Sequence, residues 1–271
     1  MTNVALSQLR IASGNSTKNT TRALEAIESA ASSGADLVVL PELFTVGYFA
    51  FDRYARSAEP LDGETVTAVQ EAAADHGIAV LAGSFVEDLA ASTRHGFETP
   101  AAEGYANTSV FVDRTGECRS VYRKHYLFGY DSAEQELLTP GESLSVVEFE
   151  GFTVGTTTCY DLRFPELYRR LVDEGVTLVL VPSAWPYPRV EHWRVLPRAR
   201  AIENLCYVVA VNGVGEFEDA ELLGRSTVYD PWGTAVAGCG EEECLRMAHL
   251  DADAVDRRRE EFPALSDRRA L

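Results

Sequence analysis

Lysine is scarce in this sequence. Lysine and arginine together number 24 among 271 residues, but only Lys18 and Lys124 are lysines. An ammonium is a compact point charge whose pKa responds to burial, whereas a guanidinium is planar, delocalised and always protonated. Because the chain uses arginine for nearly every other cation, we interpret Lys124 as the first candidate catalytic side chain. The alternative is that Arg123, Lys124 and His125 form a solvated basic group at the end of a strand.

Long apolar runs and basic segments are missing as well. The sequence contains no stretch of about 18 apolar residues, which is the length needed to span a bilayer. The first residues also lack a basic stretch followed by an apolar signal segment. The formal net charge is −18 and the isoelectric point is ≈ 4.7. Since nucleic acids and anionic membrane surfaces carry the same sign of charge, this balance argues against both as partners. We expect an intracellular, cytoplasmic protein, and we interpret its dense carboxylates as a halophilic adaptation to a salt-rich cytoplasm.

Paired cysteines and metal-binding patterns are also absent. The five cysteines, at positions 118, 159, 206, 239 and 244, are an odd number, and an intracellular setting keeps thiols reduced. There is no Cys-x-x-Cys, and Cys239 and Cys244 have no matching His or Cys pair that would complete a zinc site. We therefore expect no metal, and we interpret all cysteines except Cys159 as small buried or turn residues.

Short β-rich runs alternate with helical patterns along the whole chain, without a linker or charge block. We predict one domain over residues 1–271, with a C-terminal tail from about residue 252 used in oligomer contacts. Several strands are apolar on both faces, which indicates an α/β fold with sheets covered by helices rather than a β-sandwich. Two segments, Ala90–Gly104 and Gly215–Glu221, are predicted as exposed loops, the second of them mobile.

The predicted elements follow from periodicity and from the residues that bound each run. The strands are Val4–Leu9, Leu37–Leu40, Ile78–Gly83, Ser109–Val112, Ser120–Lys124, Leu144–Phe149, Thr153–Thr158, Leu178–Val181, Tyr207–Asn212, Ser226–Tyr229 and Arg246–Leu250. The helices are Thr17–Ser33, Glu64–His76, Pro165–Glu174, His192–Asn204 and Ala252–Glu260.

Three charged or nucleophilic residues lie at the carboxyl ends of predicted strands. They are Glu42, Lys124 and Cys159. In α/β architectures that edge of the sheet is where ligands bind. The strand Leu178–Val181 leads to Trp185, which offers an aromatic side chain at the same edge. The four placements together favour a ligand site.

Cys159 stands between a predicted strand and a helix that begins with Pro165 and Glu166, a pattern typical of a first helical turn. Backbone N–H groups on such a turn can lower the pKa of a thiol and can bind an oxyanion. This placement favours a nucleophile, although an isolated cysteine is more often a buried structural residue.

A cysteine nucleophile paired with histidine, as in papain-like proteases, needs an imidazole near the thiol. The patterns place His76 at a helix end, His95 in a loop and His249 in a late strand, while His125 points to the face opposite Lys124. His192 remains as a candidate base, or as a helix-start or pocket residue. A carboxylate base, Glu42, is the simpler interpretation.

Four segments resemble the motifs of the nitrilase superfamily of carbon–nitrogen hydrolases. The likeness covers essentially the whole chain and implies a four-layer αββα sandwich with a Glu-Lys-Cys triad. It implies that Cys159 is the nucleophile, Glu42 the general base and Lys124 the cation that stabilises the tetrahedral intermediate. The segments are Leu40–Phe44, Tyr122–Phe128, Thr139–Gly141 and Cys159–Glu166, with further likeness at Arg198–Asn204, Asp230–Gly233 and Phe262–Arg269.

The resemblance also implies a second catalytic glutamate, six residues before the proline of a Pro-Gly turn. Here this residue is Glu134, six before Pro140, with Asp131 and Glu136 as alternatives. The implied oxyanion site also includes the backbone N–H of Tyr160. No cofactor and no metal are implied.

The segment Cys159–Asp161 reads Cys-Tyr-Asp, where true nitrilases usually carry Cys-Trp-Glu. It resembles the amidase branch that contains omega-amidases and deaminated-glutathione amidases, and Ala184–Arg189 is most similar to bacterial omega-amidases. We therefore expect cleavage of a small amide, an ω-amido dicarboxylate such as 2-oxoglutaramate, with a nitrile or an N-carbamoyl compound as alternatives.

Tyr48, Tyr160, Trp185 and Arg189 are the predicted substrate-binding residues, with Arg189 paired to a substrate carboxylate. The alternative is that Tyr48 and Trp185 only pack and that Arg189 is a solvated cation. A catalytically silent binding or regulatory relative and an unrelated housekeeping domain remain as other classes. We expect a homodimer or a larger homo-oligomer.

Overall fold

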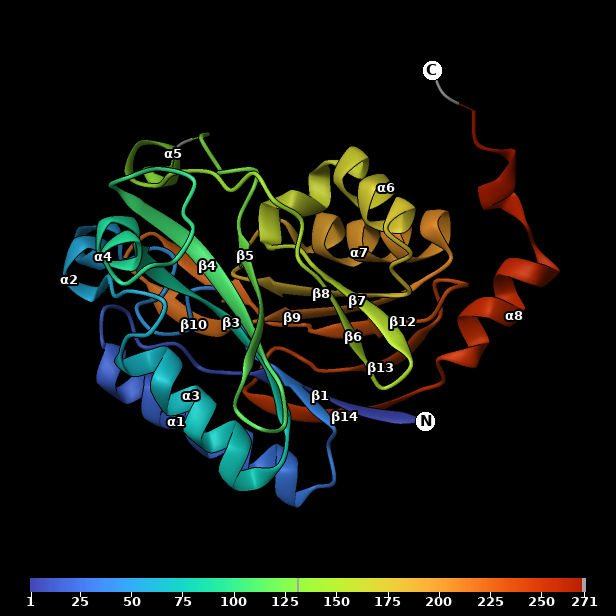
Figure 1. The fold of residues 1–271 in the computed structure, drawn as a ribbon, viewed down its shortest axis with the longest axis horizontal. Coiled ribbons are helices and arrows are strands. Elements are labelled where there is room, and N and C mark those ends of the chain that lie inside the picture. The colour runs from blue at the N-terminus through green and yellow to red at the C-terminus, as the bar shows by residue number, and fades with distance from the viewer. Residues whose placement is uncertain (131, 270–271) are drawn as a thin grey trace.

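Two six-stranded sheets pack face to face, and helices cover both outer faces (Figure 1). The structure is a computed structural model that describes residues 1–130 and 132–269. Helices α1 (Ser16–Ser32) and α3 (Glu64–His76) cover one sheet. Helices α6 (Pro165–Asp173) and α7 (Val190–Asn204) cover the other. The predicted four-layer αββα sandwich is confirmed.

The first sheet has the strand order β14-β1-β2-β3-β4-β5. Strands β1, β2 and β3 are parallel to one another, and the flanking strands pair antiparallel. Two successive antiparallel pairings make β5 run in the same direction as β2, so both strands end at one edge. The bounds are β1 Thr2–Gln8, β2 Leu37–Val39, β3 Ala79–Asp88, β4 Tyr105–Val112, β5 Cys118–Arg123 and β14 Cys244–Leu250.

The second sheet has the order β13-β12-β9-β8-β7-β6 and repeats this plan. Strands β7, β8 and β9 are parallel, and β6, β12 and β13 are antiparallel to their neighbours. The bounds are β6 Val146–Phe149, β7 Phe152–Thr156, β8 Leu178–Ser183, β9 Tyr207–Asn212, β12 Thr227–Tyr229 and β13 Ala235–Gly238.

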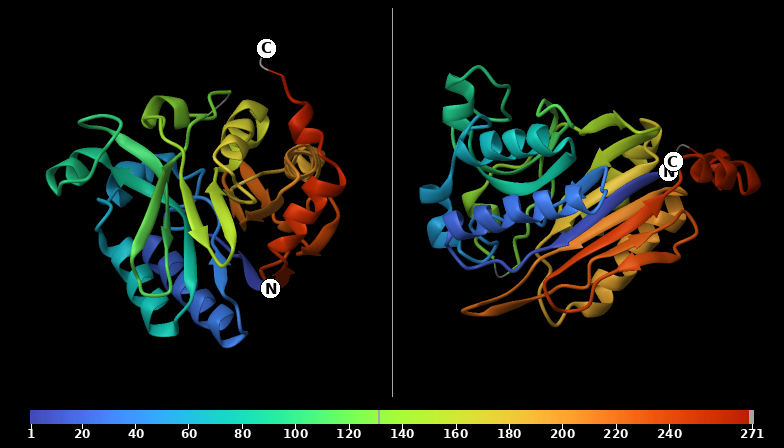
Figure 2. Two further views of the ribbon diagram at one scale, coloured as in Figure 1. Left: turned by 45° about the vertical axis from the view of Figure 1, so that its right-hand side comes forward. Right: turned by 90° about the horizontal axis from the view of Figure 1, so that it is seen from below.

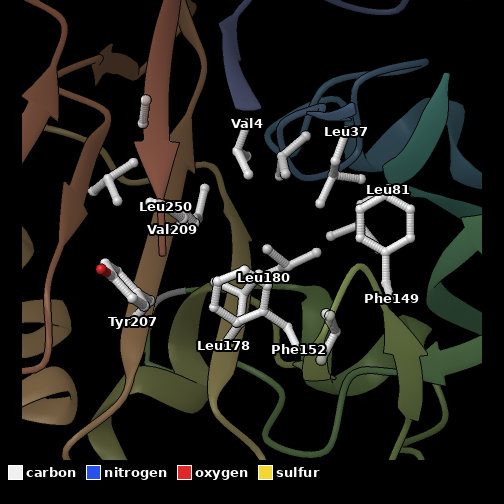
Figure 3. Close-up of a cluster of buried hydrophobic side chains, with 14 of the residues drawn as sticks. Val4, Leu37, Leu81, Phe149, Phe152, Leu178, Leu180, Tyr207, Val209 and Leu250 are labelled. Atoms are coloured by element: carbon white, nitrogen blue, oxygen red, sulfur yellow. The ribbon is translucent and has the colours of Figure 1, made fainter. Parts of the chain in front are cut away.

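An apolar cluster fills the space between the sheets (Figure 3). Val4 and Leu37 of the first sheet and Leu178 and Leu180 of the second belong to it, all fully buried. The alternate residues of the first-sheet strands, such as Val38, pack instead under α1 and α3. Because successive side chains of a strand point to opposite faces, burial on both sides explains why these strands are apolar throughout.

Shorter helices connect these layers or follow them. They are η1 Phe51–Arg53, α2 Tyr54–Ser57, α4 Leu89–Arg94, α5 Glu134–Leu137, η2 Cys159–Arg163, α8 Asp253–Glu261 and η3 Ala264–Asp267. Helix α8 lies at one end of the sandwich, outside the sheets (Figures 1 and 2). Arg259 of α8 donates to the backbone oxygens of Leu205 and Val176, and Val255 is buried. Among the described residues, no helix is long and apolar enough to cross a membrane.

The two segments predicted as loops contain regular structure. Ala90–Gly104 begins within helix α4, whose first turn is capped by the Asp88 carboxylate at the Ala91 N–H, 2.9 Å away. Gly215–Glu221 forms most of a hairpin, in which β10 (Val214–Phe217) pairs with β11 (Ala220–Leu223). The strand pairing could not be predicted because the acidic residues of this segment show no alternation of apolar and polar residues. The flanking Leu222 and Leu223 are buried.

Candidate active site

Glu42 follows β2 on a segment that crosses to the second sheet. Its backbone N–H donates to the Ser183 carbonyl at 3.3 Å, and the next residue, Leu43, has a positive φ of 45°. Gly83 makes this path possible, because a Cβ there would lie 2.0 Å from the Pro41 carbonyl oxygen. The Glu42 backbone therefore links the end of β2 in the first sheet to β8 in the second.

Lys124 follows β5 and is held by its own backbone. Its N–H donates to the Asn107 carbonyl, and its carbonyl accepts from the Gly141 N–H, both at 2.9 Å. A Cβ at Gly141 would lie 2.1 Å from the Arg123 carbonyl oxygen. The Pro-Gly motif therefore provides a glycine that can approach the Lys124 backbone closely.

Cys159 begins the 3₁₀ helix η2 with a positive φ of 48°, a conformation that non-glycine residues rarely adopt. Asp161 stabilises this turn through its carboxylate, which accepts from the Thr158 N–H at 2.8 Å. The same carboxylate accepts from the Tyr122 hydroxyl at 2.6 Å and the Tyr126 N–H at 2.9 Å. Asp161 therefore joins the Cys159 turn to residues on both sides of Lys124.

Lys124 lies between two carboxylates. Its Nζ is 2.8 Å from Glu42 Oε1, 2.8 Å from Glu134 Oε1 and 3.0 Å from Glu134 Oε2. All three side chains are fully buried. Burial by itself lowers the pKa of Lys124, but the Glu134 and Glu42 carboxylates bring it well above its usual value. Lys124 is therefore an ammonium at neutral pH.

Glu134 is the second acidic residue of this cluster. Its Oε2 also accepts from the Tyr48 hydroxyl at 3.0 Å and the Phe128 N–H at 2.7 Å. Of the two alternatives, Glu136 is exposed on α5, and Asp131 lies outside the described residues. The contacts with Lys124 are therefore made by Glu134.

The Cys159 thiol lies close enough to the Glu42 carboxylate and to the backbone amide of Ala184 for both to shift its pKa. Burial raises the pKa of the thiol, Glu42 raises it further, and Lys124 and the Ala184 amide lower it, leaving a value well above the usual range. Desolvation and the neighbouring negative charge outweigh the lowering by Lys124 and by the Ala184 amide, which belongs to the segment after β8 and not to the Cys159 turn. The resting thiol is protonated and lies next to a carboxylate that can accept its proton.

A pocket opens at Cys159 and Lys124. Aromatic rings line much of it, and the predicted residues Tyr48, Tyr160, Trp185 and Arg189 all belong to its wall. The Tyr48 hydroxyl is already bonded to Glu134, so only its ring is available to a ligand.

Arg163 is a pocket residue that sequence reasoning missed, together with Phe49, Phe128 and Pro186. Its guanidinium lies 5.4 Å from the centre of the Trp185 ring, and that of Arg189 lies 5.3 Å from the centre of the Phe128 ring. Neither guanidinium has a carboxylate partner among residues 1–130 and 132–269. The position of Arg163 within the Cys159–Glu166 motif was the available signal.

The histidine hydrogen bonds in the described residues are with groups other than the Cys159 thiol. His192 Nδ1 lies 3.0 Å from Arg163, and His125 Nδ1 lies 3.2 Å from the Arg123 carbonyl oxygen. His95 bonds to Asp62. The group that faces the Cys159 thiol is a carboxylate, so the arrangement suits a Cys-Glu pair rather than a Cys-His pair.

Known proteins resemble this chain over nearly its whole length. The family model for carbon-nitrogen hydrolase matches residues 3–260. The 2-oxoglutaramate amidase of Paenarthrobacter nicotinovorans is 40% identical over 240 residues, which are 87% of this chain and 79% of that protein.

Solved structures agree in fold. Nit3 of Saccharomyces cerevisiae, a member of branch 10 of the nitrilase superfamily, superposes with a TM-score of 0.87 at 29% identity, covering 99% of this chain and 97% of that one. A mutant amidase from Nesterenkonia sp. AN1, with the acetamide moiety of fluoroacetamide added covalently at its active-site cysteine, gives a TM-score of 0.81 at 29% identity, covering 99% of this chain and 94% of that one.

Proposed function

The chain belongs to the carbon–nitrogen hydrolases of the nitrilase superfamily and is an amidase, and from this premise we propose that it hydrolyses the terminal amide of a small ω-amido dicarboxylate such as 2-oxoglutaramate. One observation carries the proposed chemistry: a cysteine thiol, a carboxylate and a lysine side chain come together in one buried cluster at the end of a pocket.

The first half of the reaction forms a thioester. Glu42 takes the thiol proton while the Cys159 sulfur forms a bond to the amide carbon. The Lys124 ammonium and the Tyr160 N–H stabilise the negative oxygen of the tetrahedral intermediate. Glu42 then returns the proton to the amide nitrogen, the carbon–nitrogen bond breaks and ammonia leaves.

The second half hydrolyses the thioester. Glu42 removes a proton from water as the water oxygen attacks the acyl carbon, and the same two donors stabilise the new oxyanion. Collapse breaks the carbon–sulfur bond, the thiol regains its proton from Glu42, and the acid is released. Glu134 keeps Lys124 charged and oriented throughout, since it accepts from Nζ with both oxygens.

The pocket supports a substrate with a distal carboxylate. Arg163 and Arg189 place two guanidinium groups in the same small pocket as the thiol, and a guanidinium can bind a carboxylate through two parallel hydrogen bonds. The similar Paenarthrobacter protein is named for an amide of this kind. A nitrile or an N-carbamoyl compound is the alternative substrate class, and an ammonia-release screen over all three classes in high salt separates them.

Removal of either pocket arginine tests whether the substrate carries a distal carboxylate that the arginines bind. Arg163→Ala and Arg189→Ala are each expected to raise KM for 2-oxoglutaramate about tenfold or more, because a charged hydrogen bond contributes roughly 1.5–3 kcal/mol. Activity on an uncharged amide such as butyramide should stay within about twofold. Arg194→Ala, which removes a 68%-exposed arginine of α7, is the control. An unchanged KM for 2-oxoglutaramate in both pocket variants removes the assigned role.

A second prediction concerns pH. Burial raises the pKa of Asp161 to about 6, against hydrogen bonds from Tyr122, Thr158 and Tyr126 that lower it. As the pH falls through this value, Asp161 takes up a proton and can no longer accept from all three donors. We expect wild-type kcat to decline there. Asp161→Asn should have a low kcat without this decline, and a wild-type kcat that is constant from pH 5 to 7 contradicts the prediction.

We also propose that the chain forms at least a homodimer. Trp232 and Phe262 are 41% and 53% exposed, with ring centres 5.9 Å apart, beside the exposed Ile202 of α7. Light scattering at low and at molar salt tests the assembly, and Trp232→Arg should shift it toward monomer. The single domain over residues 1–271, the cytoplasmic location and the salt-rich setting stay predictions.

A further inference from the structure

Asn107 lies inside β4, fully buried, and contacts every charged member of the catalytic cluster through its side chain or backbone. Its Nδ2 is 2.9 Å from Glu42 Oε1 and 3.3 Å from Glu134 Oε1. Its carbonyl oxygen accepts from the Lys124 N–H at 2.9 Å. The mechanism above assigns it no role.

The orientation of the Asn107 amide follows from its neighbours. An amide nitrogen has two N–H donors, one for each carboxylate. If the nitrogen and oxygen were exchanged, an acceptor would face two acceptors, which is repulsive. Among the described residues, Oδ1 is buried without a hydrogen-bond partner, so the contacts of this side chain are those of Nδ2.

These donors leave the two oxygens of Glu42 unequal. Oε1 accepts from both Lys124 Nζ at 2.8 Å and Asn107 Nδ2 at 2.9 Å. Oε2 is buried and has no N–H or O–H partner in the described part of the chain. Cys159 lies close enough to this carboxylate for Glu42 to raise the pKa of its thiol, and the Cys159 and Lys124 side chains line the same pocket. The free oxygen is therefore the one available to the thiol.

The cluster also has an imbalance of charge that Asn107 relieves. Two buried carboxylates face one ammonium, whose hydrogen bonds within the described residues are all with these carboxylates. A buried carboxylate is stabilised by hydrogen-bond donors, and the second carboxylate of this cluster has no cation of its own. The two N–H groups of Asn107 are such donors, and they bring no charge of their own.

We propose that Asn107 is a positioning residue that holds Glu42 so that Oε2 alone receives the thiol proton. In this step the sulfur–hydrogen bond breaks, an oxygen–hydrogen bond forms at Oε2, and the sulfur electron pair forms the bond to the substrate carbon. Oε1 keeps its two donors before and after the transfer. The inference rests on the proposed function for its substrate step and on the geometry alone for the proton acceptor.

Two substitutions separate positioning from packing. Asn107→Leu has a similar volume and no donor, so we expect kcat to fall about 100-fold with little change in KM. Asn107→Asp keeps the shape, and its carboxyl can donate only while it is protonated. Its kcat relative to that of wild type at the same pH should be highest at the acid end of the pH range and should decline as the pH rises, because the ionised carboxylate of this variant would add a third negative charge to the cluster.

Alkylation of Cys159 by iodoacetamide, followed by mass spectrometry of its peptide, tests the same step without substrate. We expect Asn107→Leu to slow alkylation at pH 7 about tenfold or more, since the thiol is protonated and needs the oriented base. If wild type releases no ammonia from any amide but alkylation still depends on Asn107, the proposed function fails and the positioning role stands. If amides are hydrolysed and alkylation is unchanged in Asn107→Leu, the positioning role fails.

The control is Asn204→Leu, which removes another buried asparagine, at the end of α7, bonded to Arg169 and the Arg200 carbonyl. It should lower the melting temperature without changing the pH profile or the alkylation of Cys159. If Asn107→Leu does not fold, the pH profile of Asn107→Asp decides whether Asn107 positions Glu42 or only packs. A profile of wild-type shape, reduced by a constant factor, would assign Asn107 to packing alone.

Discussion

Replacement of Cys159 by alanine is expected to lower kcat for amide hydrolysis by about 10⁴-fold or more, because no thioester can form. None of the other cysteines can substitute. Cys206 is fully buried, and burial raises its pKa to about 12, while Cys118 is exposed on β5. The fold should persist, since alanine removes only one sulfur atom and adds no polar group to the buried position.

Mass spectrometry provides the direct measurement for this variant. Wild type mixed with substrate and quenched in acid should carry the acyl group on the Cys159 peptide, and Cys159→Ala should carry none. Cys118→Ala is the matched control and should retain full activity. Ammonia release by Cys159→Ala at a rate near that of wild type would rule out the thiol as nucleophile.

Replacement of Lys124 by methionine is expected to lower kcat about 10²–10³-fold, the usual effect of losing one oxyanion donor. It should also destabilise the fold by about 3–5 kcal/mol, because Glu42 and Glu134 would remain buried without their cation. Methionine retains the length of the side chain, so the effect reports on the charge. Lys18→Met, at the other and exposed lysine, should change neither quantity.

A double variant separates the two effects of Lys124. Adding Glu134→Gln to Lys124→Met removes one of the buried negative charges, so the denaturation midpoint should recover in part. The kcat should stay low, because the neutral amide of the introduced glutamine cannot stabilise the oxyanion as the Lys124 ammonium does. Recovery of activity together with stability would mean that Lys124 serves the fold and not the reaction.

The strands and long helices could be predicted because each depends mainly on residues adjacent in the chain. Helix α3 and strand β9 have the predicted bounds, Glu64–His76 and Tyr207–Asn212. The hairpin of β10 and β11 could not be predicted in the same way. Its acidic residues Glu216 and Glu221 lie opposite each other, and the pairing depends on buried leucines beyond them.

Asn107 is a residue of the site that could not be predicted from the sequence. It lies in strand β4, and Asn212 is the last residue of strand β9, but no sequence pattern assigns a role to either residue. In the fold, Asn212 holds the backbone of Trp185, whereas Asn107 bonds to two glutamates. The difference arises because β4 lies in the same sheet as the strands that lead to Glu42 and Lys124.

The sequence by itself predicted the fold class, most of the strands and the side chains proposed to carry the chemistry, because apolar periodicity and motif spacing are local properties. Only the tertiary structure decided the protonation of those side chains. Lys124 and Glu42 are 82 positions apart and meet at 2.8 Å, fully buried. A pKa depends on burial and on such neighbours, so Lys124 is held as the ammonium and Cys159 as the thiol only once the two sheets have packed.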